Sequence, residues 1–384
     1  MHSNELMNRR KPGLAGPLAL LLILLALVWA AGARMMRLEY SFYDLFQQQQ
    51  TSTASDRILV VDASTPDAGR SLWDDPRLPG LIKQLDAAGA IIVPTEPPPA
   101  STPMPDLRQL TKLLELEQQR ARRNNKDVTA LSSQLAEFRK QFENRANSEA
   151  AVAKARNVVL ALAPMNHTTA EFMLECENLA ATGPAGTLDT TPPAREYLGL
   201  PATLCGKTGH AGYSSFRPDP DGIVRESSLL VRSKDRAVPT LALAALAASL
   251  GDAPVSTKGQ KLMIGERSLS TGPGFGILHR YYHQAGPATF ETRDLDALLT
   301  DKVTPDAFDG KIVLIGRLAH ETTYRTPVDS AMPGTLLVAT SLSNLLQGDY
   351  LLRPGWLPWA ELALLIALSV LLLLLTPELS LNAA

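Results

Sequence analysis

Two long apolar runs bracket the middle part of the chain. They cover residues 14–33 and 356–375, and Glu361 is the single charged residue inside either run. Each run is about 20 residues long, which is the length that a helix needs to cross the hydrocarbon core of a membrane. The pattern therefore predicts two transmembrane helices, with one large domain over residues 38–355 between them.

Cations near the first run predict the orientation of the chain. Three of them lie at residues 9–11, before the run, and two lie within residues 34–37, after it. Because cytoplasmic segments carry an excess of Lys and Arg, residues 1–13 are expected in the cytoplasm. The large domain is then periplasmic, anchored in the inner membrane, and the short segment 376–384 returns to the cytoplasmic side.

A cleaved signal peptide is the alternative interpretation of the N-terminal part. The segment Ala31-Gly32-Ala33 has the small-residue pattern of a cleavage site. The apolar run before it is longer than the core of an ordinary signal peptide, so we favour an uncleaved anchor.

The large domain alternates short buried strands with helices. Continuous aliphatic runs predict strands buried on both faces of a sheet at residues 57–62, 90–93, 157–163 and 311–315. Helical spacing predicts helices at residues 38–46, 78–88, 239–250, 293–299 and 335–347. Further short strands are expected at residues 223–231, 262–264 and 280–282, and a polar loop at residues 47–55. The predicted fold class is α/β, with a largely parallel central sheet, flanking helices and some antiparallel additions.

A charged stretch, residues 107–156, looks like a helical insertion into this α/β pattern. Its second half has apolar residues at the alternating 3–4 spacing of a coiled-coil seam: Val128, Leu131, Leu135, Phe138 and Phe142. Two interpretations stay open. The insertion is either an ordinary amphipathic helix on the domain surface or an element through which copies of the chain associate into a homo-oligomer.

Composition excludes some classes of partner and leaves the redox state open. The net charge is -2, and no basic stripe indicates a nucleic-acid partner. The two cysteines, Cys176 and Cys205, both fall in the large domain. A periplasmic location permits a disulfide between them, and the alternative is two unrelated thiols.

Sequence motifs of common enzymes and cofactor sites are absent. There is no phosphate-binding Walker loop, no His-Glu-x-x-His zinc motif and no nucleophile elbow. His279 and His283 are four residues apart, but their surroundings are typical of a strand, which would separate them. We therefore expect no enzyme activity, no cofactor and no metal.

Three segments of the large domain carry a family resemblance. They are RILVVDAS at residues 57–64, RPDPDGIVR at residues 217–225, and GKIVLIG at residues 310–316 followed by TPVDSAMPG at 326–334. In this order they resemble the CHASE type 2 domain, an extracytoplasmic sensory module of bacterial transmembrane receptors. The resemblance covers about residues 40–350. It implies a sensor between transmembrane helices, with a cytoplasmic cyclase or kinase output domain that this sequence does not contain.

Candidate ligand-binding residues come from the strand ends and from the family-like motif. Asp62, Ser64, Glu96 and Arg317 follow predicted strands, and ligands of open α/β sheets bind beyond the carboxyl ends of the strands. The resemblance adds Arg217, Asp219, Asp221 and Arg225. The alternative for both groups is structural, because Asp and Ser also cap helices and form turns.

The residues and the resemblance together favour a membrane-anchored sensory module that responds to a small ligand or to the state of the envelope. Its expected partners are the lipid bilayer, a second copy of the chain and a possible small-molecule ligand. An oligomeric scaffold that senses nothing is the first alternative, and an envelope enzyme of unfamiliar type is the second.

Overall fold

The computed structural model describes most of the domain between the two apolar runs. The described residues are 39–64, 71–94, 115–117, 119–120, 129–165, 173–174, 187–194, 197–201, 203–214, 216–259, 261–282, 289–301 and 304–353, with 356, 359–360, 362–364, 366–368 and 370–371. The chain divides into two compact units, Met1–Phe46 with Pro354–Ala384, and Gln47–Arg353.

The first unit contains the two apolar runs. The run at 14–33 lies outside the described residues, and the run at 356–375 is described only in part, with helical positions between 359 and 371. Large apolar side chains there are exposed, including Trp359 at 72% and Leu364 at 61%. Among the helices of the described residues, none combines the length and the apolar character that a membrane span requires. The two transmembrane helices stay predictions.

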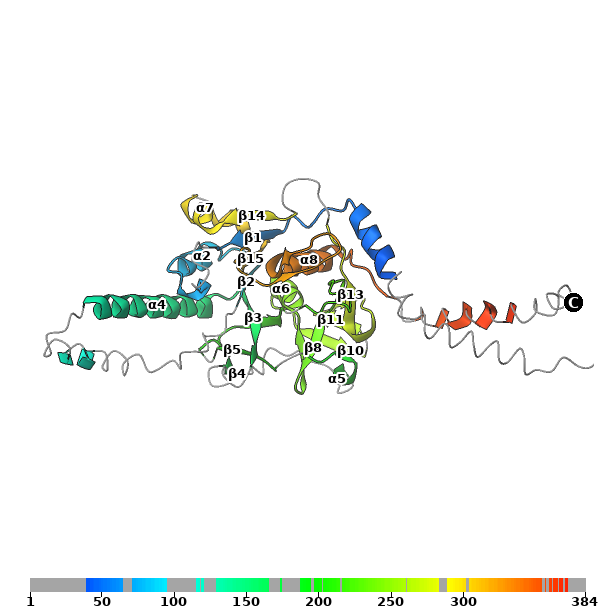
Figure 1. Ribbon diagram of the computed structural model, residues 1–384, viewed down its shortest axis with the longest axis horizontal. Coiled ribbons are helices and arrows are strands. Elements are labelled where there is room, and N and C mark those ends of the chain that lie inside the picture. Colours follow the sequence, from blue (N-terminus) through cyan, green and yellow to red (C-terminus); the bar gives the residue numbers. More distant parts are fainter. Residues whose placement is uncertain are drawn as a thin grey trace, which may run out of the picture. The chain divides into compact units, whose positions relative to one another are not determined.

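The second unit is built on a sheet whose six central strands are parallel (Figure 1). Their order is β14, β1, β15, β2, β3, β6, and their bounds are Glu291–Asp294, Ile58–Asp62, Ile312–Gly316, Ala90–Val93, Val158–Met165 and His210–Tyr213. The register places Val60 beside Leu314, and Leu314 beside Ile92. The four aliphatic runs of the sequence form β1, β2, β3 and β15, so the predicted α/β class is confirmed.

Antiparallel elements extend the unit away from this sheet. At the carboxyl end of β3, β5 (Tyr197–Pro201) pairs with the last residues of β3 and also with β4 (Met173–Leu174). Smaller sheets pair β7 (Glu226–Ser228) with β13 (Gly276–Leu278), β8 (Leu230–Ser233) with β9 (Arg236–Pro239), and β16 (Thr323–Tyr324) with β17 (Met332–Pro333). A three-stranded meander joins β10 (Val255–Lys258), β11 (Lys261–Ile264) and β12 (Arg267–Leu269).

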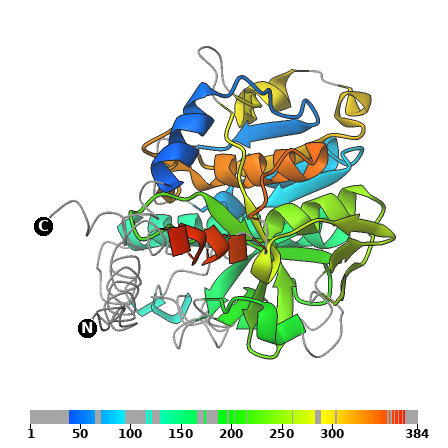
Figure 2. The same ribbon diagram turned by 90° about the vertical axis from the view of Figure 1, so that its right-hand side faces the viewer.

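Helices cover both faces of the parallel sheet (Figures 1 and 2). On one face, α6 (Leu241–Ser249) and α8 (Gly334–Gln347) pack on Val60 and Ile92. On the other face, α2 (Leu78–Gln84), the end of α4 (Thr129–Lys154) and α7 (Leu295–Thr300) pack on Leu59 and Ile91. Adjacent residues of one strand point to opposite faces, so aliphatic residues are needed at every position. Other short helices are α5 (Thr187–Thr190) and the 3-10 turns Leu72–Asp74, Pro273–Phe275 and Pro305–Phe308.

Three local predictions are wrong, each for a physical reason. Residues 280–282 form no strand, because side-chain amides rather than a neighbouring strand take their backbone hydrogen bonds. The expected strand 223–231 is divided at Leu229, whose N–H donates to Phe275 O. The expected loop 47–55 begins inside a helix, over residues 39–49, and Gln47 is fully buried.

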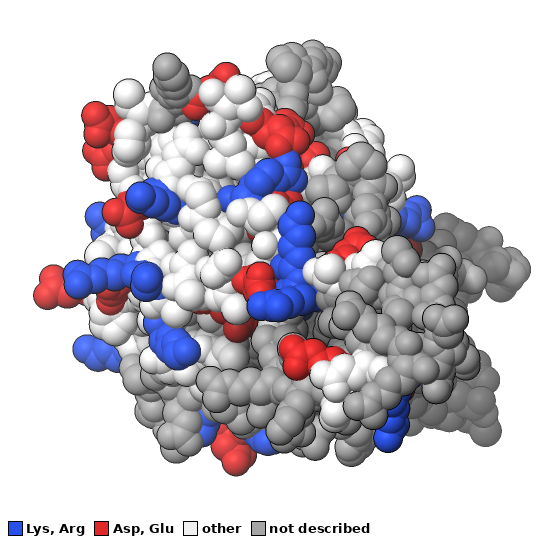
Figure 3. Space-filling model, turned by 90° about the vertical axis from the view of Figure 1, so that its left-hand side faces the viewer, with Lys and Arg blue, Asp and Glu red and all other residues white. Residues whose placement is uncertain are grey.

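The helical insertion is described mainly through α4. Its Phe138 is 40% exposed, whereas Phe142 is half-buried. Figure 3 shows the face of the molecule at the left-hand side of Figure 1, where Lys and Arg lie among Asp and Glu. Pairs such as Arg139–Glu143, at 2.9 Å, lie along α4. Exposed pairs of this kind contribute about 0–1 kcal/mol each, so they add solubility more than stability.

Gly212 allows α6 to approach the sheet closely. A Cβ atom built on Gly212, in β6, would lie 2.5 Å from Leu241 Cα and 2.7 Å from Thr240 C. Both contacts are with backbone atoms at the start of α6, which cannot rotate away as a side chain can. The absence of a side chain at Gly212 therefore sets where α6 begins relative to the carboxyl end of β6.

Substitution of Gly212 tests this close approach. We expect Gly212→Ala to lower the free energy of unfolding by about 1–3 kcal/mol, because the first turn of α6 must shift. Urea denaturation of the full chain measures the change. Gly209→Ala is the matched control, since a Cβ there meets nothing within 4 Å. Equal stability of the two variants would contradict the proposed contact.

Candidate functional site

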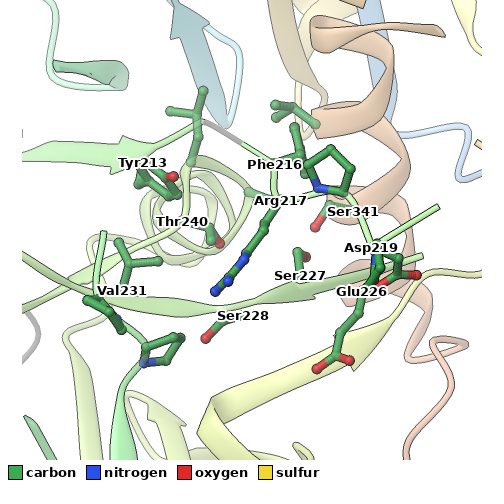
Figure 4. Close-up of a pocket in the computed structure, with 17 residues that line it drawn as sticks. Tyr213, Phe216, Arg217, Asp219, Glu226, Ser227, Ser228, Val231, Thr240 and Ser341 are labelled. Atoms are coloured by element: carbon green, nitrogen blue, oxygen red, sulfur yellow. The ribbon is translucent and has the colours of Figure 1, made fainter. Parts of the chain in front are cut away.

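A cavity of about 660 Å³ lies at the carboxyl end of β6, where α6 begins (Figure 4). Ligands of open α/β folds bind at this edge of the sheet, so the position fits a binding site. The polar side chains on its wall are Tyr213, Arg217, Asp219, Glu226, Ser227, Ser228, Thr240 and Ser341. Apolar residues and four prolines form most of the remaining wall.

Short elements position the polar side chains of this cavity. Tyr213 ends β6, and Thr240 caps α6, with its hydroxyl accepting from the N–H of Leu243 at 3.4 Å. The strand β7 contributes Glu226, Ser227 and Ser228, and is held in place by its antiparallel pairing with β13. The cavity is therefore enclosed by the main sheet, α6 and the β7–β13 ribbon.

A buried arginine organises the aspartate-rich turn beside the cavity. Arg225 is 2% exposed, and its guanidinium donates to Asp219 at 2.9 Å and to Asp221 at 2.8 Å. The hydrogen bond from Arg225 is the main cause that lowers the pKa of Asp221. Gly222, with φ of 84°, closes the turn in the left-handed conformation that glycine favours. The aspartate-rich turn thus shapes the wall of the cavity. Of Arg225, Asp219 and Asp221, Asp219 is the residue that lines the cavity.

Two charged side chains and one hydroxyl, from Arg217, Glu226 and Ser227, line the same part of the cavity wall. Arg217 is exposed and projects toward the middle of the cavity (Figure 4). Partial burial, together with the nearby Asp219 carboxylate, raises the pKa of Glu226. The Ser227 hydroxyl oxygen is buried and has no hydrogen-bond partner in the described part of the chain. Such a group indicates a missing partner, because a buried unpaired hydroxyl costs free energy.

The backbone of residues 279–281 is held by side-chain amides from two helices, an arrangement that we call the amide clamp. From the helix of residues 39–49, Gln47 donates to His279 O at 3.2 Å and accepts from Tyr281 N at 2.8 Å. From α8, Asn344 accepts from Arg280 N at 2.8 Å and donates to Arg280 O at 3.0 Å. Gln47 and Asn344 are both 0% exposed, so these bonds are shielded from water.

The strand-end candidates form a separate group. Asp62 Oδ1 accepts from the Ser64 hydroxyl at 2.6 Å and from Leu318 N at 3.3 Å, and the Ser64 hydroxyl accepts from Ala319 N at 3.1 Å. These bonds hold the loop that follows β15, where half-buried Arg317 lies. Asp62, Ser64 and Arg317 do not line the cavity, and Glu96 lies outside the described residues. Among the predicted residues that the structure describes, Arg217 and Asp219 line the cavity.

A second, smaller cavity of about 220 Å³ lies at the ends of β2, β3 and β15. Its Glu321 caps the start of α8, with one carboxylate oxygen accepting from the Thr335 hydroxyl at 2.7 Å. The other carboxylate oxygen is buried without a hydrogen-bond partner among the described residues, and burial raises the pKa of Glu321. No sequence motif singled out Glu321, because its role depends on the packing of α8.

The cysteines and potential metal ligands add little to the site. Cys205 is disulfide-bonded, and Cys176 lies outside the described residues, so the Cys176–Cys205 pairing stays a prediction. Within the described ranges, His, Cys, Asp and Glu form no group of three that could hold a metal ion.

Comparison with known families agrees with this architecture. The family model of the CHASE2 domain matches residues 19–375, which is nearly the whole chain. The chain belongs to the CHASE2 domain family. CHASE2 domains are extracytoplasmic sensory domains, which confirms the resemblance of the three sequence segments. No curated protein and no solved structure matches the chain.

In this CHASE2 domain the motif residues and the cavity residues overlap only in part. The RPDPDGIVR segment supplies Arg217 and Asp219 to the cavity, and it places Arg225 behind the wall. Glu226 and Ser227 were missed, although they directly follow this segment. Their signal is a pair of polar residues in a short strand beside an ordered turn, which sequence spacing alone does not distinguish from a surface strand.

Burial of His279 predicts a loss of stability in acid. His279 is 0% exposed, and desolvation lowers its pKa to about 4 from an ordinary value of 6.5. Below pH 6.5, His279 binds a proton in the unfolded chain, whereas in the folded chain it stays neutral down to about pH 4. Stability should therefore fall across this window by up to about 3 kcal/mol.

Urea denaturation at pH 7 and pH 4.5 measures this effect. We expect His279→Phe to lose less stability between these two pH values than the wild type does. His320→Gln is the control, because His320 is exposed and its variant should keep the wild-type pH dependence. The same pH dependence in all three proteins would exclude His279 as the cause.

Proposed function

We propose that this CHASE2 domain is a membrane-anchored sensory module of the inner membrane, with its large domain in the periplasm. A small molecule binds in the cavity, and the two flanking apolar helices carry the bound state across the bilayer. Three observations support the proposal. They are the family, the two apolar runs of the sequence, and the path of hydrogen bonds between the cavity wall and both ends of the domain.

That path is the observation that carries the proposal. The strand β7, which contributes Glu226 to the cavity wall, pairs with β13, and Leu278 at the end of β13 exchanges two backbone hydrogen bonds with Leu351, each 2.9 Å long. Leu351 lies five residues before Trp356, where the second apolar run begins. The next residues after β13 are the amide clamp, in which Gln47 belongs to the helix that follows the first run.

Both connections to the proposed anchors therefore meet on one segment, residues 278–282. A ligand that binds two arrangements of the β7–β13 ribbon with different affinity shifts their populations. Gln47 and Leu351 are both hydrogen-bonded to this segment. A displacement of the segment would therefore move both connections to the proposed anchors at the same time. The ends of the domain then report the occupancy of the cavity.

Association into a homo-oligomer also remains a proposal. The exposed Phe138 and half-buried Phe142 lie on α4 at the spacing of a coiled-coil seam. A second copy would cover these side chains, and relative motion of paired helices would then be a means of signalling.

Reporter insertion tests the location of the domain. Alkaline phosphatase inserted after Gly251, in the exposed turn that follows α6, should be active in intact bacterial cells, because the enzyme folds only in the periplasm. Green fluorescent protein inserted at the same site and exported by the same route should be dark. The opposite pair of results would overturn the periplasmic assignment.

Removal of one amide tests the clamp. Gln47→Ala leaves His279 O and Tyr281 N without partners in a buried place, so we expect a loss of about 2–3 kcal/mol in unfolding free energy. Amide exchange of Tyr281 should rise as well, measured by hydrogen–deuterium exchange. Gln49→Ala is the matched control, since Gln49 lies in the same helix and is exposed. Equal effects of both variants would contradict the clamp.

A further inference from the structure

Opposite charges face the cavity at separate places. The Arg217 guanidinium reaches toward the middle, whereas Asp219 and Glu226 lie together at one side (Figure 4). These residues come from the turn before β7 and from β7 itself, so both signs of charge are carried by elements of one wall. A ligand that enters the cavity meets a cation and an acidic pair.

The two carboxylates of the acidic side differ in their counter-charges. Asp219 already accepts a hydrogen bond from Arg225 at 2.9 Å. In the described part of the chain, no side chain donates a hydrogen bond to the Glu226 carboxylate. The positive charge of Arg353 lowers the pKa of Glu226, but burial and Asp219 raise it by more. An ammonium group beside Glu226 would favour the ionised carboxylate, because an opposite charge at close range stabilises the charged form.

The basic side is suited to a carboxylate. A guanidinium can donate two parallel hydrogen bonds to a carboxylate, and Arg217 carries that group into the cavity. The first two residues of α6, Leu241 and Ala242, also line the wall. The first N–H groups of a helix have no partner inside the helix, and its dipole attracts negative charge there.

The space between the two sides fits a small, partly apolar molecule. The unpartnered hydroxyl of Ser227 can donate to a carboxylate or accept from an ammonium group. Phe216, Val231 and Val338 supply apolar surface on the wall. The volume of about 660 Å³ falls within the usual range of ligand pockets.

We propose that the cavity binds a small zwitterion, a molecule with one carboxylate and one ammonium group, of the size of a free α-amino acid or a dipeptide. The carboxylate pairs with Arg217 and the start of α6, and the ammonium pairs with Glu226. A molecule with only a carboxylate would leave the Glu226 carboxylate without a hydrogen-bonded cation, and one with only an ammonium would place its positive charge near Arg217. This inference rests on the proposed sensory function and adds the class of ligand.

Melting of the full chain in detergent micelles tests the inference. The probes are the protein L-amino acids and L-leucyl-L-leucine, each at about 10 mM, a concentration at which even millimolar binding raises Tm. We expect at least one probe to raise Tm, and the amino-acid and dipeptide arms distinguish the two sizes. Calorimetric titration then compares the tightest probe with its analogues that lack the amino or the carboxyl group, which we expect to bind at least about tenfold more weakly.

Charge-removing variants assign the two ends of the ligand. Arg217→Gln and Glu226→Gln should each weaken binding of the tightest probe by about 10- to 100-fold while the melting temperature without ligand stays close to wild type. Arg267→Gln and Glu266→Gln are the matched controls, because both residues are exposed and lie outside the cavity wall. They should bind as the wild type does.

Two results would overturn the inference. The first is no rise in Tm with any amino acid or with the dipeptide. The second is equal binding of a singly charged analogue, which would reject the zwitterion but leave a ligand-binding sensor in place. The reporter insertions and the Gln47→Ala variant test the proposed function without any ligand, so the two failures can be told apart.

Discussion

Burial of the parallel sheet on both faces is the constraint on which the rest of this domain depends. The central strands β1, β15 and β2 carry aliphatic side chains at nearly every position, so each face needs its own layer of helices. Because α6 and α8 cover one face and α2, α4 and α7 cover the other, the polar side chains of this region lie at the ends of the strands. The cavity lies at such an end, where Gly212 in β6 lets the start of α6 approach the sheet closely.

The β7–β13 ribbon relates this edge of the sheet to the ends of the domain. It forms one wall of the cavity, and it continues into the segment to which Gln47 and Leu351 are bonded. The buried Arg225 adds to the same unit, because its backbone carbonyl accepts from His279 N at 2.9 Å while its guanidinium orders the aspartate-rich turn. Tyr281 contributes a further bond, from its hydroxyl to Val224 O at 2.7 Å. Cavity wall, turn and domain ends are thus neighbours in one hydrogen-bonded region.

The sequence predicts the parts of this structure that depend on local pattern. Aliphatic runs such as RILVVD predict strands buried on both faces. Gly348, with φ of 67°, ends α8 at the residue that the sequence pattern predicts. Contacts between distant residues carry no such pattern. In the sequence, Gln47 looks like part of a polar loop. One of its hydrogen-bond partners in the fold is His279, which lies 232 residues away, so no local pattern predicts its burial. Likewise, Arg217 and Asp219 were found through a family motif, whereas Glu226 and Ser227 acquire meaning only when β13 and α6 enclose them.

The amide clamp has a consequence for the environment in which the domain works. Carboxamides neither titrate nor carry net charge, so bonds from Gln47 and Asn344 are insensitive to ionic strength and to proton concentration. An ion pair in the same place would weaken with added salt if water could reach it. A space outside the cytosol takes its salinity and acidity from the surroundings. In the proposed sensor, the bonds from Gln47 and Asn344 would therefore hold the two ends of the domain equally well at low and at high salt. Ligand binding in the cavity, rather than the ionic strength of the surroundings, would then change what those ends report.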